Sequence, residues 1–173
     1  MASYSNVPPR FPAQEVSNRK LMSADARDLL DADYARLAML FAEFERMAHR
    51  NELAAKKGIA ARIFLELTVH MQVVEEILHP AACEALRDND VARRARDQHA
   101  FVKRLIDQLE SMSPTDDSYD IKMMALGDYA LRDIEREESA LLPQISTTDV
   151  DFNGVCAALT SRRSQLMSAM RLQ

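Results

Sequence analysis

Four stretches of the sequence carry apolar residues at intervals of three and four, the spacing that places side chains on one face of an α-helix. The four stripes are Leu30, Tyr34, Leu37, Phe41, Phe44 and Ala48; Ala60, Ile63, Leu67, His70, Val74 and Ile77; Val91, Ala95, His99, Val102, Ile106 and Leu109; and Met123, Leu126, Ala130, Asp133, Glu137 and Leu141. Only three glycines interrupt this pattern. The chain is therefore predicted to be all-α, an antiparallel up-down four-helix bundle.

The two ends of the chain predict additions to this bundle. Residues 1–22 hold three of the six prolines and several polar residues, which indicates an extended N-terminal arm. Residues 23–173 then form a single helical-bundle domain. An additional C-terminal helix is expected from about Asp151, with an apolar face that either packs outside the four helices or is covered by a second copy of the chain in a homodimer.

Charge and hydropathy exclude several classes of partner. The net charge is −5 and no basic stripe is present, so nucleic acid is not an expected partner. No stretch approaches the roughly 20 apolar residues of a membrane span, and the first residues lack the features of a signal peptide. These observations predict a cytoplasmic protein that does not bind membranes. Cys83 and Cys156 lack C-x-x-C spacing and are expected to be reduced thiols.

Polar side chains interrupt the inner faces of the predicted helices at mid-length. These are His70, His99, Asp133 and Glu137, with Tyr34 on the first helix. Burying ionisable groups is costly without a partner, and several of them in one layer favour a shared metal ion. The alternative is a metal-free ionic network in which the two histidines pair with the two carboxylates.

Two segments that end in proline share one pattern. Aligned on Pro80 and Pro143, the second and fourth helices place His70 opposite Asp133 and Val74 opposite Glu137. The same inward positions therefore recur in both helices, as expected for a metal cage inside a bundle.

Residues 25–145 resemble the hemerythrin-like, HHE cation-binding family. The resemblance is carried by the segments 29–34, 67–80, 98–103 and 133–143 in the family's order and spacing. Taken position by position, it places the family's histidines on Tyr34, His70, His99 and Asp133, and its two bridging carboxylates on Val74 and Glu137. His70, His99 and Glu137 keep the family's residue types, whereas Tyr34, Val74 and Asp133 depart from them.

These departures change the metal site that the resemblance implies. Tyr34 and Asp133 would supply oxygen in place of nitrogen, which argues against reversible dioxygen carriage. Val74 cannot bind a metal, so a two-iron site is not expected unless a local π-bulge turns Glu75 inward. The resemblance then implies one non-haem iron, manganese or zinc ion held by His70, His99, Asp133 and Glu137, with Tyr34 nearby.

The leading functional prediction is a metal-binding protein with an altered, mononuclear iron site that serves iron or oxygen/redox binding or sensing. An enzyme is not expected, because no nucleophile and base set or glycine-rich phosphate loop is present. A ferritin-like di-iron site is also disfavoured, since that site needs glutamate and histidine at i, i+3 on two helices and the sequence does not repeat this spacing on a second helix. The alternative function is a metal-free bundle that acts as an interaction or small-ligand-binding module.

Overall fold

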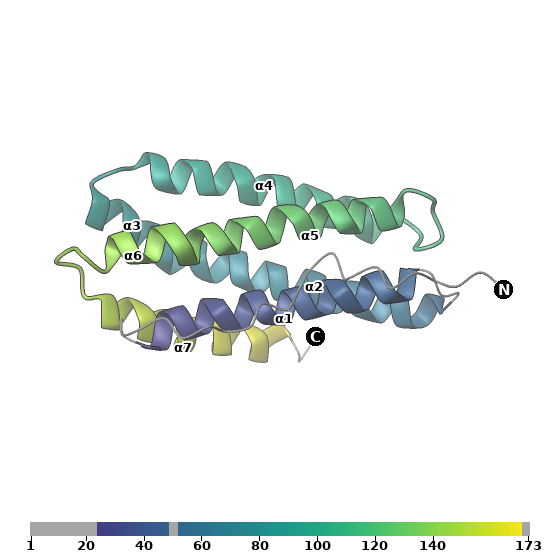
Figure 1. The fold of residues 1–173 in the computed structure, drawn as a ribbon, viewed down its shortest axis with the longest axis horizontal. Helices are drawn as coiled ribbons and strands as arrows, with labels where there is room; N and C mark the ends of the chain where they lie inside the picture. The colour runs from purple at the N-terminus through teal and green to yellow at the C-terminus, as the bar shows by residue number, and fades with distance from the viewer. Residues whose placement is uncertain (1–23, 49–51, 171–173) are drawn as a thin grey trace, which may run out of the picture.

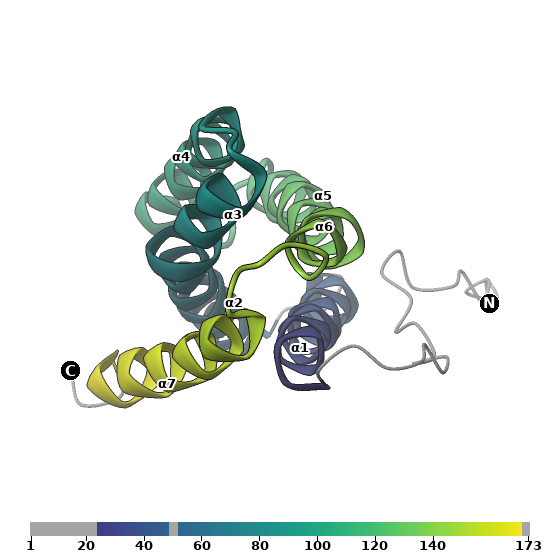
Figure 2. The same cartoon turned by 90° about the vertical axis from the view of Figure 1, so that its left-hand side faces the viewer.

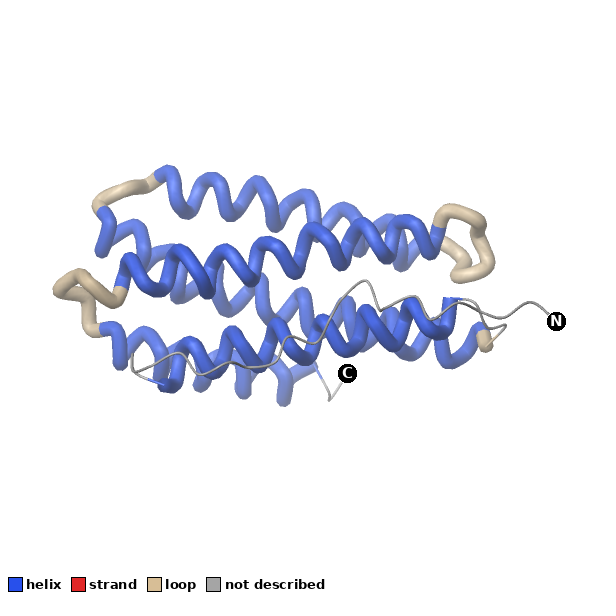
Figure 3. The backbone as a smooth tube through the Cα atoms, viewed as in Figure 1, coloured by secondary structure: helices blue, strands red, loops and turns tan. Residues whose placement is uncertain are grey.

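A computed structural model describes residues 24–48 and 52–170 of the chain (Figure 1). The elements are α1 (Ala24–Ala48), α2 (Leu53–Val73), η1 (Val74–Leu78), α3 (His79–Leu86), α4 (Asp90–Ser111), α5 (Tyr119–Arg136), η2 (Glu137–Leu141), α6 (Leu142–Ile145) and α7 (Phe152–Met170). Within these ranges the backbone is helical apart from short connections (Figure 3), which confirms the all-α prediction. The predicted arm, residues 1–22, lies outside the described residues.

The elements combine into a bundle of long helical rods. The π-helix η1 joins α2 to α3 without a break, and η2 joins α5 to α6 in the same way. Seen from its end, the bundle places α1, α2, α4 and α5 around a common axis, and α7 lies outside against α1 and α2 (Figure 2). None of the described helices is long and apolar enough to cross a membrane.

The C-terminal helix α7 buries its apolar side within its own chain. Cys156, Leu159 and Leu166 are buried and belong to one cluster with Val69 and Leu78 of the bundle. The predicted reason for a homodimer was an uncovered apolar face on this helix, and that reason no longer applies. The homodimer itself stays a prediction.

The core consists of two apolar clusters that lie along the bundle. One is formed by α1, α2, α4 and α5, and the other by the end of α2 with η1, α3, α6 and α7. The buried histidines and carboxylates come from the segments where the two clusters adjoin. A polar layer therefore crosses the bundle between its two apolar parts.

Each π-helix ends two residues before a proline. The sequence predicts a kink or break at Pro80 and an end of the fourth helix before Pro143, but the structure continues through both prolines. A proline has no N–H group and its ring crowds the carbonyl four residues earlier, so an unmodified α-helix cannot accommodate it. The chain widens instead, with i to i−5 bonds from His79 N to Val74 O and from Leu142 N to Glu137 O.

Gly58 offers a simple test of the α2 assignment. It is exposed within the helix, and a Cβ atom at this position would meet no described atom within 4 Å. Gly58→Ala should therefore stabilise the protein by about 0.5–1 kcal/mol, because alanine loses less backbone entropy on folding. Urea unfolding of the variant and the wild type measures this difference, and a loss of stability would contradict the assigned helix.

Candidate metal centre

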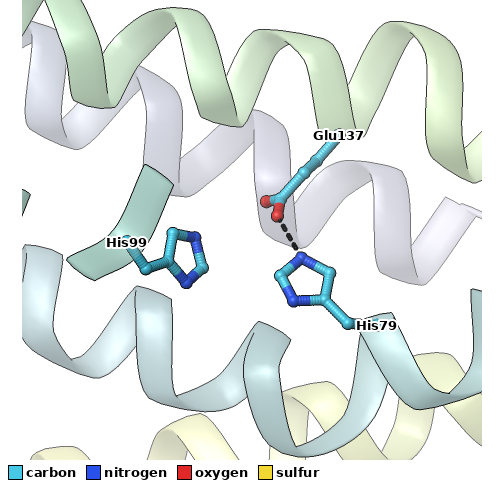
Figure 4. A group of neighbouring side chains, drawn as sticks. All are labelled: His79, His99 and Glu137. Carbon is cyan, nitrogen blue, oxygen red and sulfur yellow. Dashed lines mark hydrogen bonds and ion pairs between the residues drawn. The ribbon is translucent and has the colours of Figure 1, made fainter. Parts of the chain in front are cut away.

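Three buried residues from different rods converge in the polar layer. His79 begins α3, His99 lies in α4 and Glu137 begins η2, and all three are at most 2% exposed. One ligand atom from each lies within 4.8 Å of the others. Figure 4 shows the three side chains directed toward one another, with His79 Nε2 at 2.7 Å from Glu137 Oε1. Two imidazoles and one carboxylate thus share a single buried site.

The π-helix explains why His79 faces this site together with His70. The two residues are nine apart, so a regular α-helix would place them about 180° from each other. The additional residue in the turn of η1 rotates the following side chains back by about 100°. As a result both imidazoles contact one carboxylate, with His70 Nε2 at 3.3 Å from Glu137 Oε2. Sequence spacing did not predict His79 as part of the site.

Glu137 and His70 carry strongly shifted pKa values. Burial would raise the pKa of Glu137, but hydrogen bonds and charge from His70 and His79 lower it to about 2. Burial would lower the pKa of His70, but Asp33 and Glu137 raise it to about 9. The two carboxylates therefore favour the imidazolium form of His70, whose Nδ1 lies 3.4 Å from Asp33 Oδ2.

His99 is held between two carboxylates of its own. Its Nδ1 lies 2.7 Å from Glu75 Oε1 and its Nε2 lies 3.2 Å from Asp133 Oδ2. Glu75 belongs to η1, so the structure contains the inward turn of Glu75 that the sequence analysis made conditional on a π-bulge. Burial opposes ionisation of Glu75, but Lys103 and His99 outweigh it and lower its pKa. Arg136 pairs with Asp133 at 2.5 Å.

The structure brings the predicted ligands together as two pairs. His70 contacts Glu137, and His99 contacts Asp133. Tyr34 is half-buried on α1, where burial and the charges of Glu135 and Glu138 raise its pKa. The α1 side chain that contacts His70 is Asp33.

Asp33 and Val74 are two buried residues whose positions can be compared with the expectations from the sequence. Asp33 lies four residues before Leu37 and seven before Leu40, and both leucines are buried. This spacing is the signal that would have placed Asp33 on the inner face. Val74 is fully buried in the second apolar cluster, so the position that the resemblance assigns to a bridging carboxylate is part of the core.

The donor set of His79, His99 and Glu137 fits a metal ion. Imidazole nitrogen and carboxylate oxygen are common ligands of zinc and of non-haem iron. Two atoms that bind one ion at about 2.1 Å with tetrahedral or octahedral angles lie roughly 3.0–3.4 Å apart, so the widest separation among the three, at most 4.8 Å, would need to shorten by up to about 1.8 Å. His79 Nδ1 has no hydrogen-bond partner among the described residues, so a single hydrogen bond restrains this ring.

A cavity of about 190 Å³ leads from the surface to His79 and Glu137. Its walls come from α3, α4 and the η2–α6 rod, and it is lined by Arg94 and Arg136 together with small apolar side chains. The cavity therefore borders His79 and Glu137, although both side chains are buried.

Comparison with known proteins places this chain in a family. The family model described as the hemerythrin HHE cation binding domain matches residues 25–145. A curated protein named "DNA nickase" from Nostoc sp. (strain PCC 7120) is 24% identical over 119 residues, which cover 69% of this chain and 33% of that protein. The chain thus spans about a third of that relative's length. No solved structure gives a significant match. Because the family model covers more than half of the sequence, the chain belongs to the hemerythrin HHE cation-binding family.

Proposed function

We propose that this protein binds a single cation through His79, His99 and Glu137. The observation that carries the proposal is the convergence of two imidazoles and one carboxylate within 4.8 Å in a buried layer. This ligand set differs from the one that the resemblance implies, because His79 replaces His70, Asp133 and Tyr34. In this arrangement His70 contacts Glu137 from outside, whereas Asp133 contacts His99 Nε2 and would have to release it when that nitrogen binds an ion.

The surroundings of His99 support its role as a ligand. Metal-bound histidines commonly donate their second ring N–H to a carboxylate, which fixes the orientation and tautomer of the ring. The Nδ1 of His99 has this contact with Glu75, and Lys103 Nζ holds the same carboxylate at 2.8 Å. Nε2 is then the nitrogen of His99 that faces the site.

We propose iron as the ion and redox-linked sensing as the role. Two histidines and one carboxylate form the donor set found in many non-haem ferrous sites, while zinc and manganese accept the same ligands. Bound iron would supply a one-electron redox change in a buried environment. We propose no enzymatic turnover, because His79 and Glu137 serve as ligands and the described residues that line the cavity include no serine, threonine, cysteine or lysine to act as a nucleophile beside them.

A metal-free interaction module is the second candidate function. It is favoured by one observation: the acids around the histidines already have cationic partners. These pairs are Glu75 with Lys103, Asp133 with Arg136, and Asp33 with Arg163. Such a network can stabilise a defined core without an ion.

Metal titration of two variants separates the proposed ligand set from the set that the resemblance implies. Metal-free wild-type protein should take up one ferrous ion per chain under anaerobic conditions. His79→Ala should weaken binding by more than the roughly 10–100-fold cost of losing an outer contact, because it removes a ligand. Tyr34→Phe should bind as the wild type does. Elemental analysis after gel filtration measures the bound ion.

The titration tests the proposed ligand set and also the metal-free alternative. Weakened binding in Tyr34→Phe with normal binding in His79→Ala would contradict the proposed ligands. Absence of binding in the wild type would favour the metal-free module.

A further inference from the structure

The helix α7 lies outside the segment that the family model matches, yet it sends a charged side chain into the polar layer. Arg163 is 8% exposed, and its Nη2 lies 3.0 Å from Asp33 Oδ1 and 2.6 Å from Glu66 Oε2. A guanidinium that is removed from water needs anionic partners in good geometry. Arg163 therefore depends on these two carboxylates, which also lie 3.4 Å and 3.3 Å from Nη1 of the more exposed Arg36.

Asp33 connects Arg163 to the candidate ligands. Its second oxygen, Oδ2, faces His70 Nδ1 at 3.4 Å, and His70 Nε2 faces Glu137 Oε2 at 3.3 Å. The other oxygen of Glu137 accepts a hydrogen bond from His79 at 2.7 Å. Each carboxylate uses one oxygen toward each neighbour, so the contacts form an unbroken series from α7 to the candidate metal centre.

The neighbouring residue on α7 provides a natural comparison. Arg162 forms a two-point contact with Glu76 of η1, with Nε at 2.6 Å from Oε2 and Nη2 at 3.1 Å from Oε1. This pair is substantially exposed to solvent. Arg162 joins α7 to η1 but makes no contact in the buried series. Because its ion pair is exposed to solvent, the pair contributes little to stability.

We infer that Arg163 is a positioning residue of the candidate metal centre. By holding Asp33, and through it His70, against Glu137, α7 sets the affinity of the site for its cation. The inference rests on the proposed function, since it concerns the affinity of the site proposed above. It gives α7 a role in the site although this helix contributes no ligand.

The sign of the effect distinguishes positioning from simple charge. Removal of a positive side chain makes the site more negative, which by itself favours a cation. Loss of orientation has the opposite effect, because outer contacts that fix metal ligands are typically worth 10–100-fold in affinity. A weaker site in the absence of Arg163 therefore reports positioning.

The test is a titration of the full-length chain with ferrous ion alone under anaerobic conditions, and with Co²⁺ as a spectroscopic probe. Arg163→Met should lower the affinity by about 10–100-fold and alter the visible spectrum of bound Co²⁺. Arg162→Met should stay within about twofold of the wild type. Arg163→Lys should retain most of the affinity, because a single atom, Nη2, makes both contacts in the wild type.

A double variant tests whether the effect passes through Asp33. In an Asp33→Asn background, Arg163→Met should cause no further loss of affinity, as expected for residues that act in series. Circular dichroism and urea unfolding of each variant establish that the helices are retained. If Arg163→Met proves unfolded, the test compares the cation affinities of three other proteins. These are the wild type, Arg163→Lys and Asp33→Asn.

Several results would overturn the inference. Unchanged or increased affinity in Arg163→Met would do so, and so would an equal loss in Arg162→Met, which would assign the effect to docking of α7 in general. These outcomes leave the proposed function intact. Failure of the wild type to bind either ion would instead refute the proposed function, and the inference with it.

Discussion

Replacement of Glu137 by alanine should abolish metal binding and destabilise the metal-free protein by about 3–5 kcal/mol. Glu137 is 2% exposed and contacts His70 and His79 at once. Its removal leaves His70 charged and buried with one of its two anions gone, and breaking a buried ion pair from one side has costs of this size. Urea unfolding in the presence of a chelator measures the stability, and ferrous titration measures the binding.

Two further variants define what the Glu137 result means. Glu135→Ala removes an exposed carboxylate two residues earlier and should change stability by less than about 0.5 kcal/mol. Glu137→Gln keeps the shape of the side chain, so a loss of binding in this variant can be assigned to charge rather than to a cavity. Wild-type stability in Glu137→Ala would contradict the buried network described above.

The pair of His70 and Glu137 should make its largest contribution to the stability of the metal-free protein between about pH 4.5 and 6.5. The pKa of His70 is raised from 6.5 to about 9, so its contribution is complete below about pH 6.5 and is lost as the pH rises toward 9. The pKa of Glu137 is lowered from 4.5 to about 2, so its contribution is complete above about pH 4.5 and is lost as the pH falls toward 2.

Each side of this pH profile should change stability by on the order of 3 kcal/mol, since one pKa unit corresponds to about 1.4 kcal/mol. The two sides report the same contact and are not added together. Chemical unfolding across the pH range measures the profile. His70→Gln should remove the alkaline decline and reduce the acid decline, because His70 is one of the two histidines that lower the pKa of Glu137. A wild-type stability that stays constant from pH 6.5 to 9 would show that His70 is not held as an imidazolium.

The fold was accessible from the sequence because its inner faces obey one simple period. In α4 the predicted stripe from Ala95 to Leu109 is buried at every member, and Val91 at its start is half-buried. The same holds for the α5 stripe from Met123 to Glu137. Spacing of three and four residues reports the buried side of a regular helix, and these helices are regular over most of their length.

The site was less accessible because its geometry depends on two departures from that period. A π-helix rotates every side chain after it, so α-helical spacing did not place His79 in the site and left the inward turn of Glu75 conditional on a π-bulge. On α1, Asp33 and Tyr34 flank the inner face, and a rotation of one position decides which of them meets His70. The prolines at 80 and 143 were visible in the sequence, but the helical widening ahead of them was not.

The cationic partners of the acids in the polar layer have a consequence for how any ion would be held. Lys103, Arg136 and Arg163 keep the carboxylates paired before a metal arrives. The binding energy of an ion is then not needed to fold the chain, in contrast to small zinc domains that fold only with their metal. The net binding energy of the ion is also reduced, because the ion must displace existing contacts of the carboxylates. If the proposed cation binds here, we expect it to exchange with the surroundings, so that the occupancy of the site follows the supply of metal rather than recording how the protein was made.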